Sequence, residues 1–89
     1  MWYVYILESQ SDNKNYVGMS DNLSRRITLH NSGKVTFTQY RVPFKIIYCE
    51  AYLNKHDAAA REQFLKSGWG KNFIKRVLKN YLKAKKFGG

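Results

Sequence analysis

Six large apolar side chains recur at helical spacing near the end of the chain, and they limit what it can fold into: Phe73, Ile74, Val77, Leu78, Tyr81 and Leu82. With 89 residues, the chain is long enough for one domain with one modest core. Such a domain can hardly leave six such side chains in water, so we expect a helix from Lys71 to about Lys83 that covers the core. The opposite side of this helix is basic: Lys71, Lys75, Arg76, Lys79 and Lys83.

The first part of the chain has the pattern of a hairpin followed by a helix. Aromatic and β-branched residues predict a strand over residues 2–8. A run of turn-forming residues then leads into a second strand over 15–18. Ser20 or Asp21 can cap a helix that ends at about Asn31.

The middle of the chain predicts a loop, a third strand and a second helix. Residues 34–42 show neither helical nor strand periodicity, so we expect a loop there with at most a short helical turn. Residues 44–52 follow a proline and predict a strand. Asn54 can cap a helix that runs to about Lys66, where the two glycines of Gly68-Trp69-Gly70 are expected to break it.

These elements predict one α+β domain with the order β-β-α-β-α-α: a small three-stranded antiparallel or mixed sheet flanked by helices. We expect the domain to span residues 1–83 and residues 84–89 to form a frayed basic tail. The single cysteine, Cys49, excludes an intramolecular disulfide. No apolar run is long enough for a membrane span, and the first residues do not have the pattern of a signal peptide. A reduced, cytoplasmic protein is therefore the expectation.

The charge of the chain points to a polyanionic partner. Sixteen Lys and Arg against six Asp and Glu give a formal net charge of +10. Residues 54–89 hold ten of the basic and two of the acidic side chains, so this part carries most of the charge. The excess favours nucleic acid as a partner, although solvated lysine that keeps a small protein soluble gives the same count.

Three polar residues are expected to lean toward the core. In helical projection Leu23 and Ile27 mark the inward face of the first helix, and Arg26 and His30 lie one turn apart beside it. Glu62 falls toward the apolar side of the second helix. Each alone is explained by a boundary position or a salt bridge with a nearby Lys or Arg. Together they suit phosphodiester chemistry, and Tyr5 and Tyr16 lie on strands that we expect to pair, so their hydroxyls can reach one pocket.

At these positions the sequence resembles a known family. Tyr3-Val4-Tyr5 and, after ten residues, Tyr16-Val17-Gly18 are similar to the paired motif of the GIY-YIG nuclease superfamily, especially its small bacterial single-domain members. Arg26, His30 and Glu62 follow in the order and at the spacing of that family. The resemblance covers nearly the whole chain.

The resemblance implies a DNA endonuclease that uses one Mg²⁺ or Mn²⁺ ion, with DNA repair or processing as a candidate role. Glu62 would hold the metal ion. Arg26 would donate to a non-bridging phosphate oxygen. One of Tyr5 and Tyr16, helped by His30, would deprotonate or orient the attacking water, and the residues alone do not decide which. Seven basic side chains are candidates for contacts with the DNA backbone: Lys34, Arg41, Lys45, Lys71, Lys75, Arg76 and Lys79.

The sequence departs from the family pattern at a few positions. Tyr3 replaces the first motif glycine, Met19 stands where the excision-repair incision subunit has a lysine, and Ile74 stands where many members have a polar residue. Trp69 can stack on a base, but we expect it to plug the junction between two helices.

Two alternatives are weighed against a nuclease. One is a basic nucleic-acid-binding module without catalysis, which has the same salt-sensitive affinity for DNA. The other is a membrane-surface or protein-binding role for the basic C-terminal helix. The second is disfavoured, because the apolar stripe of that helix is needed to cover the core.

Overall fold

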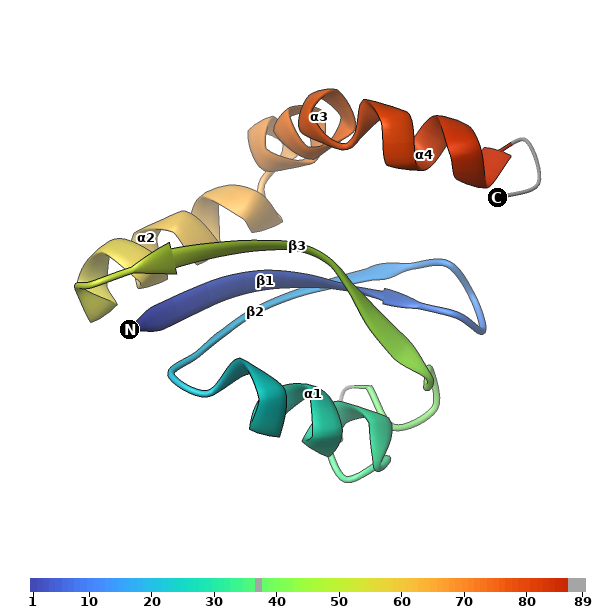
Figure 1. Cartoon of the computed structure of the whole chain (residues 1–89), viewed down its shortest axis with the longest axis horizontal. Coiled ribbons are helices and arrows are strands. Elements are labelled where there is room, and N and C mark those ends of the chain that lie inside the picture. Colours follow the sequence, from blue (N-terminus) through green and yellow to red (C-terminus); the bar gives the residue numbers. More distant parts are fainter. Residues whose placement is uncertain (37, 87–89) are drawn as a thin grey trace.

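The computed structural model describes residues 1–36 and 38–86 and has the predicted α+β architecture. The described part of the chain contains, in order, β1 (Trp2–Ser9), β2 (Asn15–Ser20), α1 (Leu23–Asn31), β3 (Phe44–Tyr52), α2 (Lys55–Lys66), α3 (Gly68–Val77) and α4 (Lys79–Lys86). Figure 1 shows a three-layer arrangement, with α1 on one face of the sheet and α2, α3 and α4 on the other.

The sheet has the order β2-β1-β3, and both neighbours run antiparallel to the central strand β1. The predicted three-stranded sheet is confirmed, and it is antiparallel throughout. Successive side chains of β1 face opposite sides, as strand geometry requires. Val4 and Ile6 pack with α2 and α3, whereas Tyr5 and Leu7 pack on the side of α1.

Two apolar clusters therefore hold the layers together. The larger is built on Val4, Ile6, Ala58, Leu65 and Ile74, each at most 6% exposed. The smaller contains Tyr5, Leu7 and Phe44, against which Leu23 and Ile27 of α1 pack. The expected inward face of the first helix is thus confirmed.

The helix caps agree with the predictions at α2 and differ at α1. The Asn54 side chain accepts a hydrogen bond from the His56 backbone N–H at 2.8 Å, as expected for an N-cap. At α1 the cap is Asn22, and the prediction of Ser20 or Asp21 was wrong. Asn22 accepts from the Arg25 N–H at 3.0 Å, while Ser20 bonds to the backbone of Asn22 instead.

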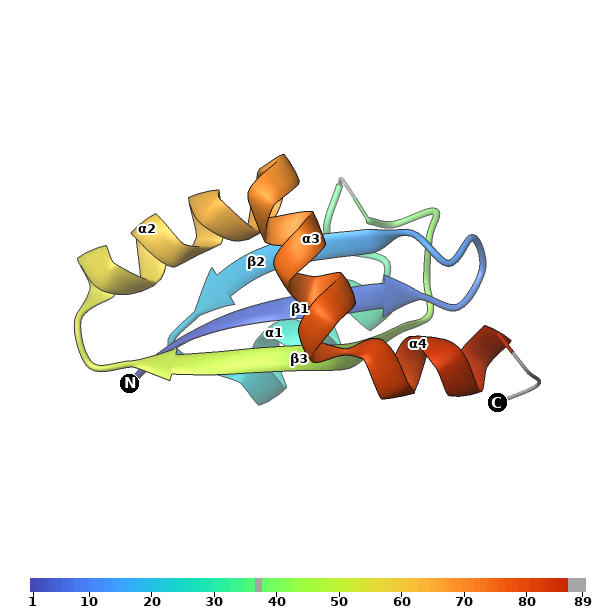
Figure 2. The same cartoon turned by 90° about the horizontal axis from the view of Figure 1, so that it is seen from above.

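We predicted that Gly68 and Gly70 would break the helix that ends near Lys66, but both lie in the first turn of α3. The break is at Ser67, whose extended backbone ends α2 and whose side chain caps α3. A Cβ at Gly70 would overlap the Phe64 carbonyl oxygen and the Leu65 backbone. The glycine thus allows α3 to leave directly from the end of α2 (Figure 2).

The predicted single helix after Lys71 is two helices, with a break at Leu78. The break turns α4 toward the far end of β1, where Tyr81 donates to Glu8 Oε1 at 2.7 Å and Lys85 donates to Glu8 Oε2 at 2.6 Å. Glu8 is 2% exposed, so this pairing offsets the cost of burying its charge. Residues 84–86, which were expected to belong to a frayed tail, lie in α4, which runs to Lys86. Residues 87–89 of the expected tail lie outside the described part.

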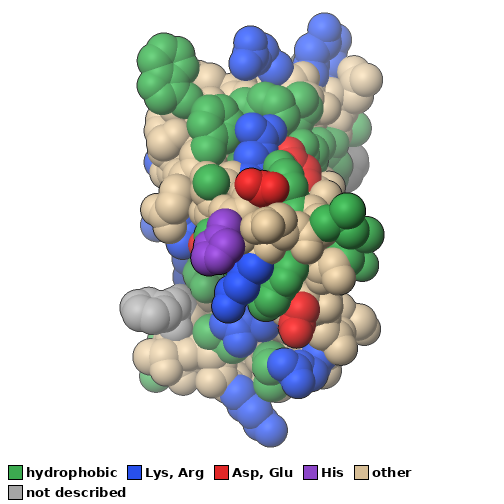
Figure 3. All heavy atoms as spheres, turned by 90° about the vertical axis from the view of Figure 1, so that its left-hand side faces the viewer, with side chains coloured by type: hydrophobic (Ala, Val, Ile, Leu, Met, Phe, Trp, Pro, Cys, Tyr) green, Lys and Arg blue, Asp and Glu red, His purple; other side chains and the backbone are tan. Residues whose placement is uncertain are grey.

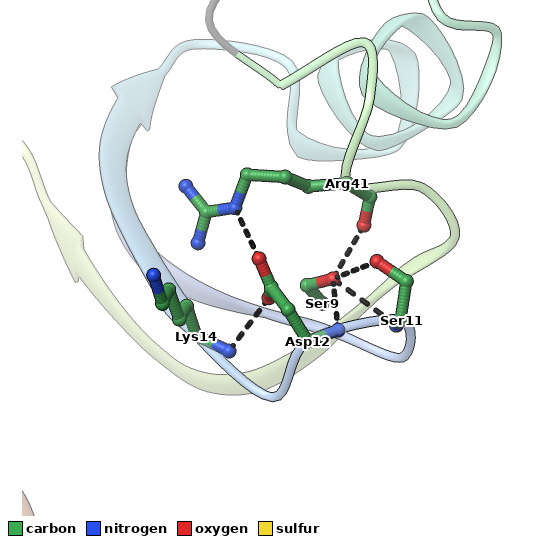
Figure 4. Close-up of polar contacts among 5 residues, drawn as sticks. All are labelled: Ser9, Ser11, Asp12, Lys14 and Arg41. Carbon is green, nitrogen blue, oxygen red and sulfur yellow. Dashed lines mark hydrogen bonds and ion pairs between the residues drawn. The ribbon is translucent and has the colours of Figure 1, made fainter.

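The β1–β2 turn is tied to the loop before β3 (Figure 4). The Ser9 hydroxyl donates to the Arg41 carbonyl, and Arg41 Nε donates to Asp12 Oδ2 at 3.2 Å. Arg41 is therefore engaged within the fold. None of the described helices is long and apolar enough to cross a membrane.

Candidate active site

Tyr5 of β1 is held over the one residue of β2 that leaves room for its ring. Tyr5 pairs with Gly18 in the antiparallel register. An ideal Cβ at Gly18 would lie 2.6 Å from the Tyr5 hydroxyl oxygen and 2.7 Å from Cζ. The glycine of Tyr16-Val17-Gly18 thus has a local reason, since any side chain there would displace the phenol.

The Tyr5 hydroxyl meets His30 on α1. Its oxygen lies 3.5 Å from His30 Nε2, and the other ring nitrogen, Nδ1, lies 2.9 Å from Thr38 Oγ1. Thr38 can donate its own hydroxyl proton to the Val35 carbonyl at 3.5 Å. This arrangement favours the tautomer in which His30 Nδ1–H donates to Thr38 and Nε2 accepts from Tyr5.

Burial sets the protonation of this pair. Tyr5 is 1% exposed and His30 is fully buried. Burial raises the pKa of Tyr5, although Arg26 beside its hydroxyl acts in the opposite direction. Burial also lowers the pKa of His30, and the charge of Arg26 lowers it further. Both groups are therefore neutral near pH 7, with a protonated phenol next to an imidazole that has a free lone pair.

Arg26 and Tyr16 are the half-buried neighbours of this buried pair. The Tyr16 ring centroid lies 5.0 Å from that of His30. The charge of Arg26 acts on both Tyr5 and His30, so its guanidinium lies within electrostatic reach of both. Arg26 and His30 share one side of α1, as their four-residue spacing predicted.

Glu62 lies on α2, on the other face of the sheet from α1. Burial dominates the raised pKa of Tyr5, and the negative charge of Glu62 adds to it only weakly. The Glu62 side chain is 17% exposed, and it pairs with Lys66 across 3.6 Å. The structure thus brings together four of the predicted site residues, Tyr5, Tyr16, Arg26 and His30. Glu62, on the other face of the sheet, is connected to them only through the weak effect of its charge on Tyr5.

The other two glutamates are occupied by the fold. The Glu50 carboxylate accepts hydrogen bonds from Nε and Nη2 of Arg61, at 2.9 and 3.0 Å. It also accepts hydrogen bonds from the hydroxyls of Tyr48 and Tyr52. Burial, followed by the hydrogen bond to Glu50, raises the pKa of Tyr48 to about 12. Glu8 is held by α4 as described above. Glu62 is therefore the glutamate whose oxygens are left for another ligand.

This donor set fits a hard cation held by a single protein carboxylate. Within residues 1–36 and 38–86 no three His, Cys, Asp or Glu side chains gather into a metal cluster. Mg²⁺ is often bound through one or two carboxylates, with water and phosphate oxygens completing its shell. Lys66 competes for the same carboxylate, but it is half exposed, and such an i,i+4 pair contributes only about 0.2–0.5 kcal/mol.

A groove beside Tyr16 gathers basic residues that the sequence reasoning partly missed. Its volume is about 570 Å³, and its lining includes Tyr16 together with Lys14, Lys66, Lys71 and Lys75. Lys71 and Lys75 were predicted to contact DNA, whereas Lys14 and Lys66 were not. Thr38 was also missed, because it lies in a loop without periodicity and nothing in the sequence indicates its contact with His30.

The remaining predicted DNA contacts are spread over the surface. Lys34, Arg76 and Lys79 are exposed. Lys45 is exposed and lies over the Tyr81 ring at 5.1 Å, and Arg41 is paired with Asp12. The expected place of Trp69 was wrong: it does not plug a helix junction but is 79% exposed on α3.

Comparisons with known proteins identify the family of the chain. Residues 1–76 match the family model described as the GIY-YIG catalytic domain. A UPF0213 protein of Streptococcus pneumoniae is 38% identical over 65 residues, which span 72% of this chain and 65% of that protein. A UPF0213 protein of Clostridium perfringens is 42% identical over 67 residues, 74% of this chain and 71% of that protein. The match thus spans just under two thirds of the Streptococcus pneumoniae relative.

A solved structure has the same fold. The solution NMR structure of a UPF0213 protein from Bacillus halodurans superposes with a TM-score of 0.54 at 34% sequence identity, and the match covers 86% of this chain and 85% of that one. Since the family model covers residues 1–76, all five site residues lie within the matched region. The chain therefore belongs to the GIY-YIG family.

Proposed function

We propose that the chain is a divalent-metal-dependent DNA endonuclease that hydrolyses a phosphodiester bond. The observation that supports this most is the Arg26 guanidinium beside the buried phenol–imidazole pair of Tyr5 and His30, together with a Glu62 carboxylate that has only one exposed lysine as its partner. The match to a catalytic domain and the net charge of +10 support a nucleic-acid substrate.

Arg26 would bind the scissile phosphate. Its guanidinium is half-buried beside the Tyr5 hydroxyl. A planar guanidinium donates two parallel hydrogen bonds to phosphate oxygens, and these strengthen as charge grows on the non-bridging oxygens during attack. Arg26→Lys should therefore lower kcat, because an ammonium group cannot reproduce the forked geometry.

Tyr5 and His30 would take the proton of the attacking water. A buried phenol with a raised pKa is a poor base by itself. Tyr5 can instead accept the proton while passing its own hydroxyl proton to His30 Nε2, which starts neutral. Tyr5 stays neutral, His30 becomes imidazolium, the water oxygen bonds to phosphorus, and the bond from phosphorus to the 3′ oxygen breaks.

This assignment favours Tyr5 over Tyr16 as the residue in the proton path. Tyr5 is bonded to an imidazole acceptor, whereas Tyr16 is half-buried and lines the basic groove. Because Tyr5 is 1% exposed, neighbouring side chains must move aside when substrate and water enter. Tyr5→Phe should lower kcat by about 10²–10⁴-fold and change its pH profile, whereas Tyr16→Phe should mainly raise KM.

Glu62 would hold the metal ion. When bound, Mg²⁺ or Mn²⁺ supplies Lewis-acid stabilisation of the scissile phosphate and the departing 3′ oxygen. Lys66 must release the carboxylate for this, so Lys66→Gln should tighten Mn²⁺ binding.

The decisive experiment compares the wild type with Glu62→Ala on plasmid, flap and branched DNA in the presence of Mg²⁺ or Mn²⁺. We expect the wild type to nick DNA and Glu62→Ala not to nick it. Glu62→Ala should bind DNA with the affinity of the wild type. Gln63→Ala, one exposed position further along the same helix, is the matched control and should nick normally. A carefully purified wild type that nicks none of these DNAs with either metal would instead indicate a non-catalytic nucleic-acid-binding module.

A further inference from the structure

Trp69 is a large aromatic side chain that the fold leaves in water. It is 79% exposed and belongs to neither apolar cluster. The other tryptophan, Trp2, packs against the larger cluster. Trp69 is therefore available to a partner, at the start of α3.

The surroundings of Trp69 are cationic and continue into the basic groove beside Tyr16. Trp69, Lys71 and Lys75 line an open hollow of about 480 Å³, together with Gly68 and Asn72. Lys71 and Lys75 also line the larger groove that contains Tyr16. The two depressions therefore share these lysines as a common wall. One extended ligand can lie along both depressions.

The charge of this region selects the partner. From residue 63 to residue 86 the chain has eight Lys and Arg and no Asp or Glu. At the end of the molecule shown in Figure 3, by contrast, acidic side chains lie among the basic ones. A second copy of the chain that docked through this region would meet its own positive charge, whereas a polyanion is attracted.

We propose that Trp69 is a stacking platform for an unpaired nucleobase of the bound DNA, with Lys71 and Lys75 on the phosphates that flank this base. The inference rests on the proposed function and deepens it, because it makes local unpairing near the cut a feature that the protein reads. An exposed indole face suits any base, since every base has a π-face, and lysines suit the backbone as point charges.

The test measures binding without cleavage. The full-length protein is titrated in EDTA with three labelled DNAs: a paired duplex, the same duplex with a bulge of unpaired thymidines, and the same bulge with abasic nucleotides. The abasic bulge keeps the phosphates and the distortion but removes the bases. We expect the wild type to bind the thymidine bulge about 5- to 100-fold more tightly than the abasic one.

Substitutions then test which side chains cause the preference for the thymidine bulge over the abasic bulge. Trp69→Ala should lose it without weakening binding to the paired duplex, and Trp69→Phe should keep most of it. Lys71→Ala with Lys75→Ala should weaken binding to all three DNAs and reduce the salt slope by about 2. Tyr40→Ala removes an aromatic side chain of similar exposure, 88%, and should change nothing.

Fluorescence supplies a second measurement. In a Trp2→Phe protein, Trp69 is the remaining tryptophan, and the thymidine bulge should quench it more than the abasic bulge does. Equal binding of the two bulges by the wild type, or an unchanged preference in Trp69→Ala, would overturn the proposal. So would a wild type that is dimeric while Trp69→Ala is monomeric. Because EDTA prevents metal-dependent cleavage, a protein that never nicks DNA can still confirm the platform, and a nuclease without the preference refutes the platform alone.

Discussion

Gly18→Ala is the sharpest single test of how the fold builds the candidate site. The added methyl carbon would lie 2.6 Å from the Tyr5 hydroxyl oxygen and 2.7 Å from Cζ, well inside van der Waals contact. Gly18 is fixed in β2 by its antiparallel pairing with Tyr5, and the Tyr5 ring is 1% exposed. Neither partner can move without disturbing the packing around α1.

The expected cost follows from overpacking. Forcing an extra carbon into a closely packed site costs about 1–3 kcal/mol. For a domain of this size each kcal/mol lowers Tm by about 4–8 °C. Relief by rotation of the phenol would separate its oxygen from His30 Nε2, which is already 3.5 Å away. A displacement of about 1 Å in such a group can lower kcat about 100-fold, so nicking should fall more than stability alone explains.

Urea unfolding and a plasmid-nicking assay measure the two effects. Gly68→Ala is the matched control, because a Cβ there meets no atom within 4 Å. That variant should be at least as stable as the wild type, since alanine is favoured over glycine in a helix. A double variant, Gly18→Ala with Tyr5→Leu, should lose less free energy of unfolding than the two single variants together. The interaction energy between the two changes should be about 0.5–3 kcal/mol. A Gly18→Ala protein with wild-type stability and nicking would refute the reasoning.

Two further predictions concern buried ionisable groups. Burial and Arg26 hold the pKa of His30 below its ordinary 6.5, so the unfolded chain binds a proton more readily than the folded one. The free energy of unfolding should therefore fall as the pH drops below 6.5, and urea titrations on either side of that pH should show a flatter dependence for His30→Asn. Glu8→Gln removes the charge that binds Lys85 and should cost about 1–3 kcal/mol. Trypsin should then cut within α4 before the rest of the domain, and unchanged proteolysis would contradict the anchoring role of Glu8.

Much of the fold could be predicted because its determinants are local. The strands follow from runs of aromatic and β-branched residues, and the inward face of α1 follows from the spacing of Leu23 and Ile27. The break at Leu78 could not be predicted in this way. It has neither proline nor glycine, and the contact that draws α4 aside joins Tyr81 to Glu8, 73 positions earlier in the chain.

The same distinction holds for the candidate site. Helical projection placed Arg26, His30 and Glu62 near the core, since each position depends on its own helix. Thr38 could not be found, because its hydrogen bond to His30 depends on the path of an irregular loop. The exposure of Trp69 could not be predicted either, since a tryptophan between two glycines is compatible with a buried helix junction and with an open surface.

The availability of Glu62 is the clearest property that only the folded chain has. Arg61 and Glu62 are sequence neighbours, and successive side chains of a helix point about 100° apart. Arg61 is turned to Glu50 of β3, which it binds through two nitrogens, and is thereby kept from Glu62. The sequence presents several carboxylates and many cations without saying which will pair. The fold satisfies Glu50 and Glu8 with close partners and leaves Glu62 with one exposed lysine at 3.6 Å, which a metal ion can displace. Among the glutamates, the carboxylate that we propose for the metal ion is thus set apart by how the other charges are paired.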